Sequence, residues 1–148
     1  MLQFEDFEPG QVYELGSWEV TEAEILDFAR AFDPQPFHVD PDAAARSPFG
    51  GLIASGWHSA AIYMRLYVDG ILSRAASMGS PGVEELRWLV PVRPGDVVRG
   101  RFTVVETSPS SRRPDRGTVI ALCELLNQRG EVAVSFRARG FFGRRVPG

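Results

Sequence analysis

Lysine is absent from this 148-residue chain, and all 16 of its basic residues are arginine. Schiff-base chemistry needs a lysine amine, and the phosphate-binding P-loop needs a lysine beside the phosphates. The sequence therefore excludes both kinds of site. Arginines remain available to bind the phosphates of a small anionic ligand.

Cysteine and histidine are also scarce. The one cysteine, Cys123, cannot form an internal disulfide, and it lies in an alternating apolar stretch that predicts a buried strand. We interpret its thiol as structural. His38 and His58 are the two histidines, and the residue counts exclude a zinc site built on cysteine.

The sequence has no long apolar run and no secretion signal. Residues 1–10 are acidic and have no basic n-region. The most apolar segment, Trp57 to Leu72, is interrupted by Arg65 and Asp69 and falls short of the roughly 20 residues that span a membrane. We therefore expect a cytoplasmic protein without a membrane partner.

Charge is unevenly distributed along the chain. Residues 1–50 carry 11 acidic residues against two arginines, whereas residues 51–148 carry 14 arginines against eight acidic residues. The arginines are scattered along strand-like segments and alternate with acids, so the chain lacks the dense basic tract that binds nucleic acid. We expect no nucleic-acid partner.

The length favours one domain over residues 1–148, because two smaller pieces would bury too little surface. The apolar stretch from Trp57 to Leu72 predicts a buried central helix. An α+β fold is expected, in which about five antiparallel strands curl around this helix. The strand-like segments lie near residues 11–15, 82–92, 97–107, 117–127 and 131–142.

Two shorter helices are predicted before the central helix. Thr21 opens a capping box, and the helix that follows ends at Asp33 because the next residue is proline. Asp40 followed by Pro41 is typical of another helix start. The segment 33–40 contains two prolines and is expected to be extended, stiff and irregular.

Asp33 and His38 are the candidate acid–base pair. Histidine titrates near neutral pH, and a nearby carboxylate can orient its imidazole or hold a water molecule beside it. The prolines stiffen the segment, so little entropy is lost in positioning the pair. The residue types alone leave open the alternative that both side chains make ordinary caps and loop hydrogen bonds.

A second candidate is the pair Ser55 and Gly56 at the start of the central helix. A helix N-terminus offers unpaired N–H groups and a partial positive charge, and glycine lets a ligand carbonyl approach the backbone. An oxyanion site for a thioester carbonyl can be built this way. The alternative is that Ser55 is an ordinary N-cap and Gly56 a packing glycine.

The sequence resembles the signature of MaoC-like dehydratases in two segments, residues 33–40 (DPQPFHVD) and residues 49–56 (FGGLIASG). These proteins form the (R)-specific enoyl-CoA hydratase group of the hot-dog proteins. Their motif is Asp-x-Asn-Pro-x-His-x-Asp, followed by a phenylalanine-rich turn and an apolar segment that enters the central helix at a glycine. The likeness continues through residues 83–88 and 91–96 and covers most of the chain.

The resemblance implies a hot-dog fold and a lyase that adds water reversibly across the α,β double bond of an enoyl thioester. Asp33 and His38 would hold a water molecule and act as general base and acid. The Gly56 N–H, with Ser55 beside it, would bind the thioester oxygen as it becomes enolate-like. Gln35 stands where the motif has asparagine, and Ser55 where a histidine commonly precedes the glycine.

The resemblance also implies the partners. The substrate is an acyl-CoA or an acyl-carrier-protein thioester; no cofactor is needed, since coenzyme A is part of the substrate. Arg112, Arg113 and Arg116 either meet its phosphates or belong to a solvated loop. Hot-dog domains of this family usually pair through their sheets, so we expect a homodimer or a dimer of dimers.

Two other functions are compatible with the implied fold, namely an acyl-CoA thioesterase and a non-catalytic acyl-binding subunit. Thioesterases of this fold commonly need a carboxylate on or near the central helix, where the sequence offers Asp69, late in the helix. A purely structural subunit need not keep both Asp33 and His38. His58 follows Gly56 by two residues and is expected to pack in the core or against another subunit.

Overall fold

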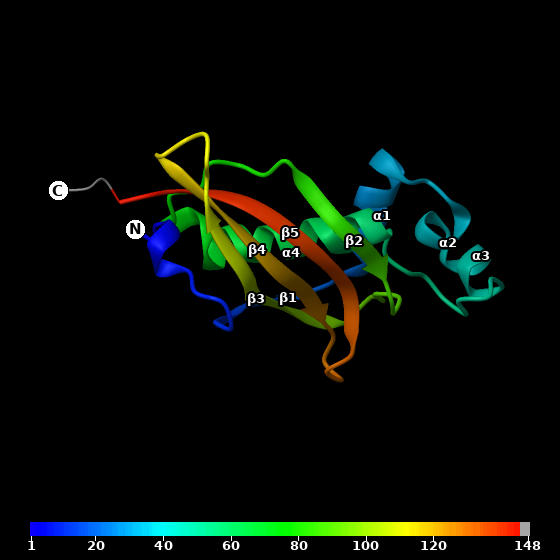
Figure 1. The fold of residues 1–148 in the computed structure, drawn as a ribbon. Helices are drawn as coiled ribbons and strands as arrows, with labels where there is room; N and C mark the ends of the chain where they lie inside the picture. Colours follow the sequence, from blue (N-terminus) through cyan, green and yellow to red (C-terminus); the bar gives the residue numbers. More distant parts are fainter. Residues whose placement is uncertain (146–148) are drawn as a thin grey trace.

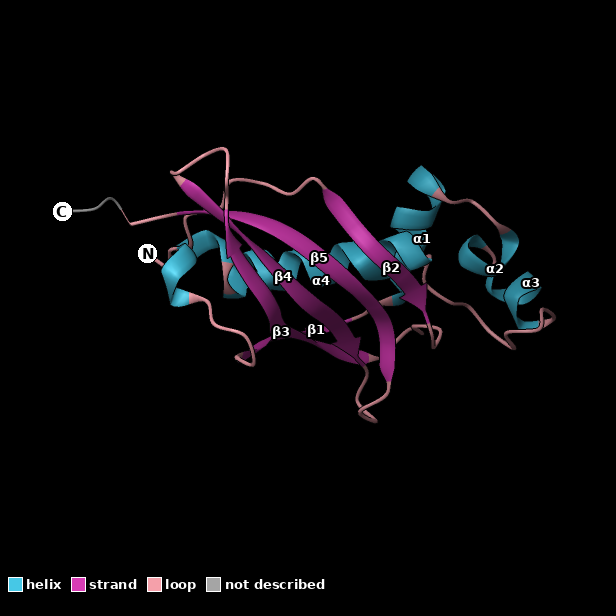
Figure 2. Ribbon diagram, viewed as in Figure 1, coloured by secondary structure: helices cyan, strands magenta, loops and turns pink. Residues whose placement is uncertain are grey.

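The computed structural model describes residues 1–145 and contains one antiparallel sheet of five strands (Figures 1 and 2). The strands lie in the order β1-β3-β4-β5-β2. They are β1 (Val12–Glu19), β2 (Gly82–Trp88), β3 (Val97–Pro109), β4 (Arg116–Leu126) and β5 (Val132–Gly143). The helices are α1 (Glu22–Phe32), α2 (Pro36–Val39), α3 (Pro41–Ala45) and α4 (Gly56–Gly70). The predicted α+β architecture is therefore confirmed.

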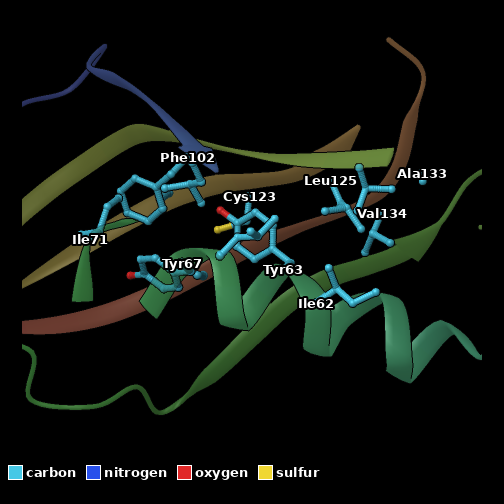
Figure 3. Close-up of a cluster of buried hydrophobic side chains, with 14 of the residues drawn as sticks. Ile62, Tyr63, Tyr67, Ile71, Phe102, Cys123, Leu125, Ala133 and Val134 are labelled. Atoms are coloured by element: carbon cyan, nitrogen blue, oxygen red, sulfur yellow. The ribbon is translucent and has the colours of Figure 1, made fainter. Parts of the chain in front are cut away.

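Helix α4 lies along the inner face of the curled sheet and packs at the centre of the core (Figures 1 and 3). Strands β3 and β4 alternate between buried and more exposed side chains, because a helix covers one face of them. Tyr63 of α4 packs edge-on against Phe136, and Tyr67 stacks on Phe102. Cys123 is buried in this core, and burial raises the pKa of its thiol to about 12. The thiol stays protonated at neutral pH, in agreement with a structural role.

One side of α4 is left open. Trp57 and Met64 are 59% and 46% exposed, and Arg65 pairs with Asp69 in solvent at 2.9 Å. The expectation that the central helix is buried on all sides is wrong for this side. Across residues 1–145, no helix is long and apolar enough to cross a membrane.

Both predicted helix starts are confirmed. The hydroxyl of Thr21 accepts a hydrogen bond from the N–H of Glu24, and the Glu24 carboxylate accepts one from the N–H of Thr21. The carboxylate of Asp40 accepts hydrogen bonds from two N–H groups of α3. Helix α1 is thus fixed at its start and runs to its C-cap, Asp33.

The predicted boundaries were wrong at three places. Strand β1 runs to Glu19, and β2 ends at Trp88, so residues 89–92 do not continue the strand. The segment 33–40 is not irregular throughout, because it contains α2. Pro36 begins this short helix, and proline suits a first helical position because its φ is fixed and no N–H partner is needed there.

The loop between β3 and β4 lies at the end of the molecule opposite to α2 and α3 (yellow in Figure 1). This loop carries Arg112 and Arg113, and Arg116 follows at the start of β4. Arg116 lies 3.0 Å from the Asp115 carboxylate beside it. These arginines therefore lie away from α2 of the same protomer.

Candidate active site

Asp33 and His38 come together because α1 and α2 meet at a tight turn. Asp33 caps the end of α1, and its N–H donates to the carbonyl of Ala29. Pro34 then prevents the helix from continuing. His38 lies on α2, with its Nε2 3.4 Å from Oδ2 of Asp33. The structure thus brings the two predicted acid–base groups into direct proximity.

The tautomer of His38 follows from its other ring nitrogen. The side chain is buried, and Nδ1 lies 2.7 Å from the backbone oxygen of Ile53. Because a carbonyl oxygen can only accept, Nδ1 must donate, which leaves Nε2 of the neutral ring as an acceptor. Nε2 and the Asp33 carboxylate are therefore two acceptors facing each other, and a water molecule or a proton can bridge them.

Two more side chains donate to the carboxylate of Asp33. Gln35 Nε2 donates to Oδ1 at 2.7 Å, and the hydroxyl of Ser55 donates to Oδ2 at 2.8 Å. Burial raises the pKa of Asp33, but the hydrogen bonds from Gln35 and Ser55 and the nearby His38 outweigh burial and bring it below its ordinary value. Asp33 is consequently a carboxylate at neutral pH.

Ser55 occupies the N-cap position of α4 without capping the helix through its side chain. A serine at this position usually accepts a hydrogen bond from an N–H of the first turn. Here the buried hydroxyl donates instead to Asp33, which lies 22 residues earlier in the chain. The interpretation of Ser55 as an ordinary N-cap is therefore wrong.

Gly56 begins α4 beneath the indole of Trp88. A Cβ at position 56 would overlap the Trp88 ring, and Trp57 packs edge-on against the same ring with centroids 5.1 Å apart. Packing is thus one reason for a glycine here. The N–H of this first helical residue has no partner within the helix, so the residue also remains available to bind a ligand.

A cavity of about 380 Å³ opens beside these residues. Asp33, His38 and Gly56 line it, and apolar side chains supply most of the remaining wall: Phe37, Phe49, Trp57, Trp88, Val90 and Val92. The sequence analysis did not predict this apolar lining. Its signal in the sequence is the set of aromatic residues in and beside the two motifs. A mostly apolar cavity lined by a few polar groups is typical of a small-ligand site.

Other ionisable candidates lie outside this cavity. Asp69 is exposed near the far end of α4 and pairs with Arg65. Within residues 1–145, no cluster of three or more His, Cys, Asp or Glu side chains could hold a metal ion. Asp33 and His38 are therefore the two ionisable side chains among the described residues that line the cavity.

His58 packs against α1. Its ring stacks on Phe28 with centroids 5.0 Å apart, and its Nε2 lies 3.4 Å from the Glu24 carboxylate. The other ring nitrogen is buried without a hydrogen-bond partner among residues 1–145. The expected core position of His58 is confirmed. Burial lowers the pKa of His58 by more than Glu24 raises it.

This burial predicts a pH-dependent loss of stability. The unfolded chain binds a proton at His58 near the ordinary pKa of about 6.5, and the folded chain binds it only at lower pH. The stability that comes from burying neutral His58 is therefore fully present above pH 6.5. It is lost as the pH falls toward the pKa of His58 in the folded chain. Urea unfolding at pH 7.5 and at pH 5.5, about one unit on either side of that pKa, measures this effect. We expect the free energy of unfolding to fall less between the two pH values in His58→Gln than in the wild type. An equal loss in both proteins would contradict the assignment.

Comparison with known proteins places the chain in a family. The model of the MaoC like domain matches residues 5–121. The chain is similar to the crystal structure of a MaoC-like dehydratase from Rhodospirillum rubrum, with a TM-score of 0.93 and 45% identity over 99% of this chain and 100% of that one.

Two further proteins are similar over nearly the whole chain. The (R)-specific enoyl-CoA hydratase of Rhodospirillum rubrum is 30% identical over 142 residues, which cover 93% of each chain. The R-hydratase PhaJ1 of Pseudomonas aeruginosa, solved in the unliganded form, has a TM-score of 0.78 and 25% identity over 98% of this chain and 87% of that one. The chain therefore belongs to the MaoC-like dehydratase family, as its sequence motifs indicated.

Proposed function

We propose that this protein is a hydratase that adds water reversibly across the α,β double bond of an enoyl thioester. The observation that carries the proposal is the Asp33–His38 pair, 3.4 Å apart in the lining of a mostly apolar cavity that Gly56, the first residue of α4, also lines. The names of the Rhodospirillum and Pseudomonas relatives support the same reaction class. The acyl carrier is coenzyme A or an acyl carrier protein, and the reaction uses no other cofactor.

The geometry suits the activation of one water molecule. A water between Nε2 of His38 and the Asp33 carboxylate donates one hydrogen to each acceptor. Its oxygen is then left with lone pairs that can attack the β carbon of a substrate in the cavity. Loss of a proton to one member of the pair accompanies the attack, and the α carbon receives a proton in return. One or both members of the pair carry these transfers.

The start of α4 supplies the charge stabilisation. As water adds, electron density moves onto the thioester oxygen, which becomes enolate-like. The free N–H of Gly56 and the positive end of the helix dipole favour negative charge at this place. Ser55 positions this helix end beside Asp33 through its 2.8 Å hydrogen bond.

Thioester hydrolysis, the alternative activity of the fold, receives less support. It requires a carboxylate that directs water at the thioester carbonyl. Asp69 does not line the cavity and lies in solvent beside Arg65. Among the described residues, the one carboxylate that lines the cavity is that of Asp33, which already faces His38.

The proposal is tested by mixing the purified protein with trans-2-enoyl-CoA thioesters, branched and unbranched. Hydration removes the conjugated absorbance of the substrate without releasing a thiol. In His38→Ala the absorbance should remain. Thiol release would instead indicate a thioesterase. A protein that changes neither signal with any thioester would contradict the hydratase proposal.

We also propose that two copies pair along β2. This strand is hydrogen-bonded to β5 on one side only, and an unpaired edge favours association. Apolar side chains stand exposed beside it: Trp57 and Met64 on α4, Val83 and Trp88 on β2, and Leu89. A second copy would cover both the edge and these side chains.

Light scattering at micromolar protein should therefore give twice the mass of one chain. Met64→Glu places a charge in the proposed interface and should shift the protein toward the monomer. Val12→Glu is the matched control, since Val12 is similarly exposed on β1 at the opposite edge of the sheet. A monomeric wild type would refute the pairing.

A further inference from the structure

The two departures from the family motif meet on one carboxylate. Gln35 precedes α2 and donates to Oδ1 of Asp33, whereas Ser55 precedes α4 and donates to Oδ2. The two donors come from different elements and occupy different oxygens. Both differences from the motif therefore act on the same member of the acid–base pair.

We propose that Gln35 and Ser55 are positioning residues that hold Asp33 as a carboxylate throughout the reaction, so that His38 carries the proton. This inference rests on the proposed hydratase function and assigns the roles within its acid–base pair. Asp33 orients the water molecule, and Nε2 of His38 accepts and returns the proton.

Of the two hydrogen bonds, the one from Ser55 supports an ionised Asp33 more strongly. Its side chain is fully buried, and its hydroxyl donates to Asp33 although the N–H groups of α4 offer the usual capping partners. A donor fixed on a carboxylate stabilises the ionised form, because protonation would leave two hydrogens competing for one oxygen. Gln35 adds a second donor at 2.7 Å on the other oxygen.

The groups around Asp33 act in the same direction. Among the described residues, His38 on α2 is the ionisable side chain in contact with it, and the turn and α4 present the uncharged Gln35 and Ser55. The pKa of Asp33 lies below its ordinary value in spite of burial. His38, by contrast, has Nδ1 fixed on the carbonyl of Ile53 and Nε2 free to accept.

The proposed proton path is balanced without another reactant. Water gives a proton to Nε2 of His38 as its oxygen bonds to the β carbon and the double-bond electrons move toward the thioester oxygen. The enolate then takes the same proton from Nε2 at its α carbon, which restores the neutral imidazole. The net change is the addition of one water molecule, and Asp33 stays ionised in every step.

The test measures the titration of Asp33 directly by carbon-13 NMR of the aspartate carboxyl groups, assigned with Asp33→Asn. We expect the titration midpoint of Asp33 to rise in Ser55→Ala and in Gln35→Leu, and to rise most in the double variant. Ser59→Ala is the matched control, because Ser59 bonds to the backbone oxygen of Ser55 and not to Asp33. In Ser59→Ala the titration midpoint of Asp33 should equal that of the wild type.

Rates give a second readout that a merely structural role would not move. In Ser55→Ala we expect kcat/KM to fall about tenfold more on the acid limb than at alkaline pH, since one charge-assisted hydrogen bond is worth roughly that factor. The acid limb should also move to higher pH, because protonation of Asp33 then contributes to the loss of activity. Equal loss at every pH, or an unchanged Asp33 midpoint, would overturn the inference. If the midpoints shift as expected while the wild type hydrates no enoyl thioester, the proposed function fails and the contacts to Asp33 stand.

Discussion

Replacing His38 is expected to lower kcat/KM for enoyl-thioester hydration by about 10²-fold or more, the usual contribution of a general base. His38→Ala removes both ring nitrogens and leaves the carbonyl of Ile53 without its donor. His38→Asn is the sharper variant, because its amide can still donate to Ile53 but offers no basic nitrogen. A loss of the same size in both variants would assign the effect to the missing base and not to disturbed packing.

Asp33→Asn should lower hydration by a similar factor of about 10². The substitution keeps the size of the side chain and removes the charge that orients water and His38. Urea unfolding of each variant separates lost chemistry from lost structure. Arg65→Ala is a suitable control, since it breaks an exposed ion pair outside the cavity and should leave turnover unchanged. Near-normal turnover in the variants of both Asp33 and His38 would place the chemistry elsewhere.

Local chemistry explains why much of the fold was predictable from sequence. The capping box at Thr21, the proline after Asp33 and the alternation in β3 and β4 act over a few residues, so their outcome is visible in the sequence. The proximity of Asp33 and His38 also follows from a short proline-bound segment. These features were all confirmed in the structure.

The contacts that shape the site were less visible because they join distant segments. The sequence left Ser55 as either an oxyanion-site residue or an ordinary N-cap, and nothing in its neighbours shows that Asp33, 22 residues away, is its partner. Likewise, Trp88 at the end of β2 packs against Gly56, which lies far from it in the sequence. Sequence patterns assign each residue to an element, but such long-range partners are decided by how α1, α4 and β2 meet.

Gly56 has two suggested roles that variants can separate, and the first is packing. Gly56→Ala should destabilise the protein by about 1–3 kcal/mol, because the new Cβ would overlap the Trp88 indole. In a Trp88→Ala background the same substitution should cost less than about 0.5 kcal/mol, since the obstructing ring is gone. Urea unfolding of the four proteins measures both values. An equal cost in the two backgrounds would show that the contact is not the reason for the glycine.

The second role is the backbone donor, which Gly56→Pro removes. Gly56 is the first residue of α4, where proline is tolerated, and Ser55 already has the extended conformation that precedes proline, with φ −56° and ψ 140°. In the Trp88→Ala background we expect Gly56→Pro to lower kcat by about 10²–10³-fold relative to Gly56→Ala, the usual cost of losing an oxyanion donor. Both variants add a Cβ, but only alanine keeps the N–H. Equal rates would therefore show that the thioester oxygen is bound by another group, and a large difference would assign it to the start of α4.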